Sequence, residues 1–108
     1  MTSDGSAYVR FKRALDIGNL NLIRATAAEL PRIGLPDALE VCLLMRDHRD
    51  GRFERAAVRW LGRFALEARD ATLEAIQTAA AALRIMPQRP EASMEILSRL
   101  CVEYRVDR

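Results

Sequence analysis

The chain has 108 residues, of which 50% are hydrophobic and 30% charged, and its 17 basic and 15 acidic residues leave a net charge of +2. This length fits one domain that needs no metal or disulfide to fold, and so small a net charge excludes a surface built throughout for nucleic acid or anionic membrane. The apolar residues are mostly Ala and Leu, with few of the β-branched and aromatic residues typical of strands, so the predicted fold class is all-α.

The N-terminal third predicts a polar lead and two short helices. Residues 1–6 are small and polar and are expected to be flexible, and a first helix is predicted over residues 7–17. Gly18 is the residue type found just beyond a helix C-terminus. Asn19 is a typical N-cap for a second helix, which is predicted to end at Leu30, before a proline.

Two more helices are predicted in the middle of the chain. Pro36 favours the first turn of a helix over residues 36–45, and the apolar run VCLLM predicts that this helix is among the most buried. The polar loop RDHRDG, residues 46–51, leads into a helix over residues 52–69. That helix carries the only Trp and two of the three Phe.

The junction with the fifth helix is the least defined boundary, because residues 69–72 contain neither Gly nor Pro. Asp70 and Thr72 are the available N-caps for a helix over residues 73–86. The alternative is one continuous helix over residues 53–86. A separate fifth helix would be strongly buried, with one apolar stripe on the core: Leu73, Ile76, Ala80 and Leu83.

The C-terminal segment predicts a last helix and completes a single domain. The connector PQRP precedes a helix over residues 91–105, and residues 106–108 are expected to be a flexible end. Residues 7–105 are thus predicted to form one helical domain. Cys42 and Cys101 both lie in apolar helical segments, and two cysteines with one histidine make no metal set, so both are expected to be free and buried.

Two arrangements of about six antiparallel helices fit this pattern: a compact bundle or three stacked αα-hairpins. A weak internal repeat, at shifts of 33 and 37 residues, aligns Leu20 with Phe53 and Trp60 with Leu97 and favours stacked hairpins. The phrase FERAAVRWLGRF, residues 53–64, resembles the inner helix of HEAT-type helical repeats. That resemblance also implies stacked hairpins, whereas a closed six-helix bundle would produce nearly the same pattern.

The sequence contains no motif of an active site. It has no phosphate-binding glycine loop, no Cys-x-x-Cys, no His-Glu-x-x-His and no Gly-x-Ser-x-Gly pattern. His48 lies close to Asp47 and Asp50 in RDHRD, where a His–Asp pair could act in acid–base catalysis, but an exposed charged loop explains the same residues. We expect no enzyme activity, no catalytic residue, no cofactor, no bound metal and no small-molecule substrate.

The sequence also predicts neither a membrane span nor a secretory segment. The N-terminus MTSDGSAYVR lacks an apolar signal core, and the longest apolar runs are about five residues, far short of a membrane span. We therefore expect a cytoplasmic location without membrane contact.

The most pointed feature is an arginine stripe on the helix over residues 52–69. At about 100° per residue, four arginines lie on one narrow strip: Arg52, Arg55, Arg59 and Arg63. The opposite side is apolar and is expected to be core: Phe53, Ala57, Trp60, Leu61 and Phe64. The last helix balances its charges instead, with residues of opposite sign four apart: Glu95, Arg99 and Glu103.

Three interpretations of the arginine stripe remain open. The stripe is solvated or paired with nearby acids, or it binds a protein, or it follows nucleic-acid phosphates. A protein partner would be an acidic surface or a second copy of the chain in a homodimer, with Trp60 at the edge of the stripe as an anchor. Of the 17 basic residues all but Lys12 are Arg, which lowers the significance of each one.

The turn between the first two helices bears on the nucleic-acid interpretation. Ala14 and Gly18 are similar to the corresponding residues of a helix-turn-helix motif, but that motif requires an apolar residue where Arg24 stands. The second helix also lacks a set of side chains that could read bases. The sequence therefore predicts a small non-enzymatic protein-interaction or adaptor module. The alternative is a nucleic-acid-associated accessory protein.

Overall fold

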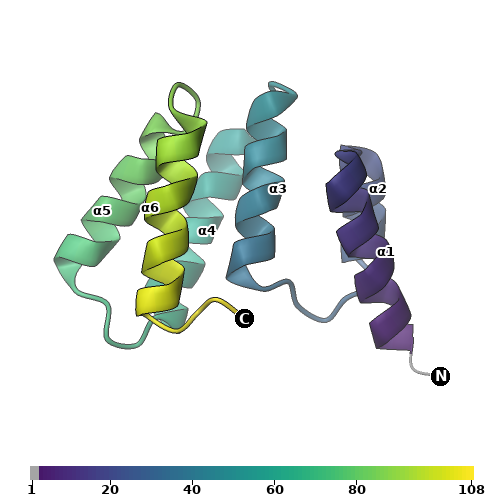
Figure 1. Ribbon diagram of the computed structural model, residues 1–108, viewed down its shortest axis with the longest axis horizontal. Helices are drawn as coiled ribbons and strands as arrows, with labels where there is room; N and C mark the ends of the chain where they lie inside the picture. Colours follow the sequence, from purple (N-terminus) through teal and green to yellow (C-terminus); the bar gives the residue numbers. More distant parts are fainter. Residues whose placement is uncertain (1–2) are drawn as a thin grey trace. The chain divides into compact units, whose positions relative to one another are not determined.

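The computed structural model describes residues 3–108, which form six helices and no strand (Figure 1). The predicted all-α class is therefore confirmed. In chain order the helices are α1 (Ser3–Ile17), α2 (Leu20–Ala27), α3 (Leu35–Asp47), α4 (Phe53–Glu67), α5 (Leu73–Ile85) and α6 (Pro90–Glu103). None of these helices is long and apolar enough to cross a membrane.

The chain separates after Ile33 into two compact units, whereas the sequence led us to expect one domain over residues 7–105. α1 begins at Ser3, inside the expected N-terminal lead, and Val106 packs against the core of the second unit. Residues 1 and 2 of that lead lie outside the described part of the chain.

Helices α1 and α2 form a hairpin that turns at Gly18 and Asn19. Gly18 has a left-handed φ of 77°, and its N–H donates to the carbonyl of Leu15 at 3.1 Å. The N–H of Asn19 donates to the carbonyl of Ala14 at 3.3 Å. The side chain of Asn19 then accepts a hydrogen bond from the N–H of Leu22 at 3.1 Å. The glycine C-terminus and the asparagine N-cap are both confirmed.

The outer ends of this hairpin differ from the predicted boundaries. Ser6 lies inside α1, where its hydroxyl accepts a hydrogen bond from Arg10, one turn further on, at 3.4 Å. α2 ends at Ala27 instead of Leu30, because the N–H of Leu30 turns back to the carbonyl of Ala27 in a tighter i→i−3 bond of 3.0 Å. An ion pair between Arg10 and Glu29 joins α1 to this turn.

The second unit, residues 34–108, is an up-and-down bundle of four helices. Each helix packs against its neighbour in the chain, and α3 also packs against α6, so that the four close into a ring (Figure 1). Of the two predicted arrangements, this unit therefore has the bundle. At one end of the ring, the guanidinium of Arg46 donates two hydrogen bonds to the carbonyl oxygen of Pro87, at 3.1 and 3.2 Å.

α4 and α5 are separate helices, so the alternative of one continuous helix over residues 53–86 is wrong. α4 ends at Glu67. The hydroxyl of Thr72 accepts a hydrogen bond from the N–H of Ala75 at 3.1 Å and thereby caps α5. Ala68, between the two helices, is buried and holds the connecting turn against the core.

The core of the bundle combines aromatic side chains from α4 with small side chains from α5. Trp60 and Phe64 stack with ring centroids 5.5 Å apart, and Tyr104 meets Phe64 edge-on at 5.9 Å. The hydroxyl of Ser93 on α6 donates to the carbonyl of Ala82 on α5 at 2.7 Å. α5 contributes four buried residues to the same core: Ala75, Ala79, Ala82 and Leu83.

The buried face of α5 is rotated relative to the predicted apolar stripe. Leu73 was expected in the core but is 83% exposed, whereas Ala75 and Ala79 are buried. Neighbouring helices pack on the alanine side because small side chains let helix backbones come close. α3 is also less buried than its apolar sequence predicts, with three buried residues: Leu35, Leu39 and Cys42.

Arginines occupy the left-handed position that follows α3 and α6. Arg49 has a φ of 53° and Arg105 a φ of 58°. In each case the N–H of the next residue, Asp50 or Val106, donates at 2.8 Å to the carbonyl five residues before it. This bond closes a Schellman motif, in which the left-handed position is usually glycine.

Replacing the arginine at either of these two positive-φ positions with glycine is expected to stabilise the bundle. Arg49→Gly and Arg105→Gly each remove a Cβ at positive φ and so relieve steric strain in the folded state. Glycine also raises the conformational entropy of the unfolded chain, which opposes this effect. The net result should be a free energy of unfolding that is higher by about 0.5–1 kcal/mol. Urea unfolding followed by far-UV circular dichroism measures the change. The control Arg59→Gly, in the interior of α4, should instead lower stability by about 1 kcal/mol. Destabilisation at both left-handed positions would contradict this prediction.

Candidate interaction surface on helix α4

Asp50 engages Arg52, the first member of the predicted arginine stripe. The two carboxylate oxygens accept hydrogen bonds from the guanidinium of Arg52 at 2.6 and 2.9 Å, and one also accepts from its backbone N–H at 2.8 Å. The hydrogen bond to Asp50 raises the pKa of Arg52. Arg52 is also the N-cap residue of α4, so it belongs to the loop that starts the helix.

Arg63, at the other end of the stripe, belongs to the packed part of α4. Its Nε donates to Oε2 of Glu67, one turn further along, at 2.8 Å, and the two side chains are only 26% and 24% exposed. Its Nη2 is buried and makes no hydrogen bond to any described residue. The guanidinium is therefore held inside the fold and does not extend the exposed part of the stripe.

Trp60 is a core residue, as the apolar side of α4 predicted. It is 2% exposed, its ring stacks on Phe64, and its Nε1 donates to the carbonyl of Leu35 at 2.8 Å. An indole whose polar atom is satisfied and whose ring is packed has no surface left for a partner. The expected role of Trp60 as a binding anchor therefore does not fit the structure.

Arg55 and Arg59 are the exposed part of the stripe. Neither makes a hydrogen bond or an ion pair with a residue of the second unit, residues 34–108. They lie one helical turn apart, so their guanidinium groups share one stretch of surface. On α6, by contrast, Arg99 pairs with Glu95 at 3.0 Å, where sequence spacing provides an acid four residues away.

Two further residues share this surface, which we call the α4 outer face: Arg55, Arg59, Gly62 and Leu66. Their spacing of four, three and four residues aligns them along one side of the helix. Leu66 is 84% exposed, and a Cβ added at Gly62 would meet no atom within 4 Å. The sequence pattern did not single out Leu66, because leucine in an amphipathic helix usually faces the core. Its position, seven residues after Arg59 and on the same side, could have identified it.

The described residues show no second cluster that points to catalysis or metal binding. No group of three or more His, Cys, Asp or Glu side chains among them could hold a metal ion. Cys42 and Cys101 are free and buried, as predicted, and burial raises the pKa of each thiol to about 11, so both are unreactive near neutral pH. His48 is exposed at the C-cap of α3, and neighbouring Asp47 pairs with Arg46 at 2.7 Å.

Comparisons with known proteins assign this chain to no family. No protein-family model matches it, and neither the curated proteins nor the solved structures contain a match. The resemblance of residues 53–64 to HEAT-type repeats therefore stays a prediction.

Proposed function

We propose that this chain is a non-catalytic protein-interaction module that binds an acidic protein surface through the α4 outer face. The exposed guanidinium groups of Arg55 and Arg59, which have no partner within residues 34–108, carry this proposal. Arginine is enriched at the centres of protein interfaces because its planar group can form two hydrogen bonds with one carboxylate. The exposed side chain of Leu66 adds an apolar contact that a partner would remove from water.

The composition of the α4 outer face favours a protein over nucleic acid, which is the alternative partner. Nucleic-acid binding draws its affinity from many phosphate contacts, and two of the four arginines, Arg52 and Arg63, are already paired with carboxylates. Two free arginines beside an exposed leucine are closer to the mixed apolar and arginine-rich composition of protein interfaces.

A cytoplasmic location fits the same proposal. Cys42 and Cys101 are both free, and free thiols persist in compartments that glutathione and thioredoxin keep reducing. A buried free cysteine also behaves as a small apolar residue, so neither side chain needs a redox role.

Reversing the two free charges is expected to abolish binding to an acidic partner. The double variant Arg55→Glu/Arg59→Glu should weaken binding of a fluorescent peptide rich in Glu and Leu by at least about tenfold, because two attractive contacts become repulsive. Fluorescence anisotropy measures the affinity, and far-UV circular dichroism checks that the helices are intact. The control Arg13→Glu/Arg24→Glu reverses two exposed arginines of the first unit and should retain binding.

A labelled DNA duplex separates the two kinds of partner. We expect weak duplex binding that does not depend on Arg55 and Arg59. Tight duplex binding that falls steeply with salt and is lost in the double variant would favour the nucleic-acid alternative. Absence of peptide binding by the wild-type protein, or peptide binding that is indifferent to both substitutions, would overturn the proposal.

A further inference from the structure

A groove of about 470 Å³ lies between α4 and α5, on a different side of α4 from its outer face. The buried residues Ala57 and Leu83 form its floor. Leu61 and Ala80 line it further out, and Val58, which is 64% exposed, stands at its edge. The groove is therefore largely apolar and open to solvent.

The exposed apolar side chains of the bundle concentrate on the same two helices. Five large apolar residues between positions 34 and 108 are exposed, and Val102 on α6 is the single one outside α4 and α5. The other four are Val58, Leu66, Leu73 and Ile85. Of these four, Val58 stands at the groove, whereas Leu66 belongs to the α4 outer face.

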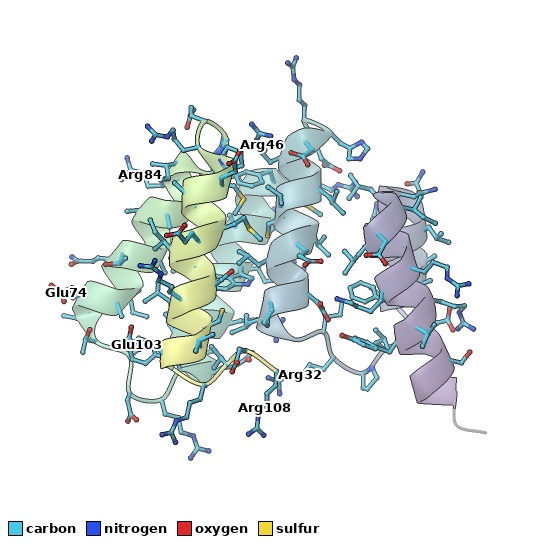
Figure 2. The ribbon with its side chains drawn as sticks, viewed as in Figure 1. Arg32, Arg46, Glu74, Arg84, Glu103 and Arg108 are labelled. Carbon is cyan, nitrogen blue, oxygen red and sulfur yellow. The ribbon has the colours of Figure 1, made fainter. Side chains whose placement is uncertain are left out.

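Two opposite charges line this groove at the same end. Glu54 is in the first turn of α4 and Arg84 in the last turn of α5, and these antiparallel helices bring both residues to the end of the bundle where Figure 2 shows Arg84. Neither has an ion-pair partner within the second unit, residues 34–108. Val58 lies one helical turn after Glu54 on α4, and Ala80 lies one turn before Arg84 on α5. The two residues therefore face each other across the groove at the same distance from its end, and valine is the larger of the two.

We propose that two copies of this chain form a dimer with their α4–α5 grooves face to face. A two-fold axis parallel to the groove places α4 of each copy over α5 of the other, in antiparallel pairs. Glu54 of each copy then lies opposite Arg84 of the second copy. By the same rotation Val58 lies opposite Ala80. Such a surface complements itself, as an interface with two-fold symmetry requires, because each contact occurs twice.

In this dimer the apolar contacts contribute affinity, and the charge pairs determine how the two copies are aligned. Val58 of each copy enters the groove of the other, which removes apolar surface from water and supplies the affinity. Ion pairs at an exposed rim add little affinity, but they fix the register and orientation of the two copies. The dimer does not depend on the proposed acidic partner, because it uses a different side of α4.

Exchanging the two charges between variants tests this dimer. Sedimentation equilibrium of the wild-type protein should show a dimer that dissociates on dilution. Glu54→Arg alone and Arg84→Glu alone each set like charges against one another twice, so each should raise the dimer Kd by at least about tenfold. An equimolar mixture of the two variants should associate like the wild type, because the charges of one variant then complement those of the other.

Matched controls distinguish the loss of dimer contacts from a loss of helix stability, because a charge change in a terminal turn can also destabilise the helix. Glu74→Arg alters the first turn of α5, at the far end from Arg84 (Figure 2), and Arg24→Glu alters the last turn of α2; both should leave the dimer Kd unchanged. Circular dichroism shows whether the charge-reversed variants fold. If one does not, the milder Glu54→Gln replaces it and should also weaken the dimer, because it removes the negative charge opposite Arg84 of the second copy. A wild-type monomer at high concentration, a dimer indifferent to both reversals, or a mixture that does not associate would each overturn the proposed interface.

Discussion

Replacing Trp60 with alanine is expected to lower the unfolding free energy of the bundle by about 3–5 kcal/mol. Trp60 is 2% exposed, so loss of the indole removes a large apolar surface from the core and leaves a cavity. It also leaves Phe64 without its stacking partner and removes the hydrogen bond from the indole to the carbonyl of Leu35. Small domains are stable by only about 5–15 kcal/mol, so this one change removes a large share of the total.

Urea unfolding followed by far-UV circular dichroism measures this loss, because the substitution removes the only Trp and with it the main fluorescence signal. Trp60→Phe keeps an aromatic ring but cannot donate to Leu35, and should cost about 1–3 kcal/mol. Leu66→Ala is the control on the same helix: its side chain is 84% exposed, so the change should stay within about 0.5 kcal/mol. A Trp60→Ala variant as stable as Leu66→Ala would contradict the core position of Trp60.

Replacing Ala79 with leucine is expected to destabilise the bundle by about 1–3 kcal/mol, although it adds apolar surface to α5. Ala79 is 0% exposed and lies in the core with its neighbours on the same face, Ala75 and Ala82. The additional carbons have no space there, so the neighbouring helices must move apart or the new side chain must leave its preferred rotamers.

Ala81 provides the matched control for this substitution. It lies two residues further along α5 and is exposed, so Ala81→Leu adds the same carbons to solvent and should change stability by no more than about 0.5 kcal/mol. Both variants are compared by urea unfolding. Equal stability of the two variants would mean that α5 does not pack on its alanine side.

The separation between the two sides of α4 makes the proposed binding to an acidic partner testable. Trp60 and Phe64 hold one side in the core, while Arg55 and Arg59 on the other side make no contact that the fold requires. Surface substitutions of this kind usually leave the fold intact. A loss of binding in the arginine double variant therefore reports on the interaction surface and not on the core.

Local sequence determines the fold class of this protein and most of its helix boundaries. Gly18 and Asn19 mark the turn of the first hairpin, and Thr72 marks the start of α5, because caps join residues only a few positions apart. The end of α2 at Ala27 differs from the prediction by less than one turn, where helix ends commonly fray. The 3.6-residue period also identified the core side of α4, including Trp60.

The candidate surface was only partly contained in the sequence. The four arginines of the stripe follow one another at three or four residues, so the spacing alone does not distinguish them. Asp50 lies close to Arg52 in the chain, and Glu67 lies four residues after Arg63. Whether such a pair persists depends on how far its surroundings exclude water. The structure shows Arg52 and Arg63 engaged, whereas Arg55 and Arg59, on the α4 outer face, have no ion-pair partner among residues 34–108.

Only the tertiary structure decided which face of α5 is buried and where a groove remains. The sequence pattern favoured the stripe with Leu73, whereas the bundle buries Ala75 and Ala79. The same packing leaves Val58 and Ala80 at the groove between α4 and α5. The physical reason is that burial depends on the distances between helices far apart in the chain, and those distances are set only when α3 packs against α6 and closes the bundle.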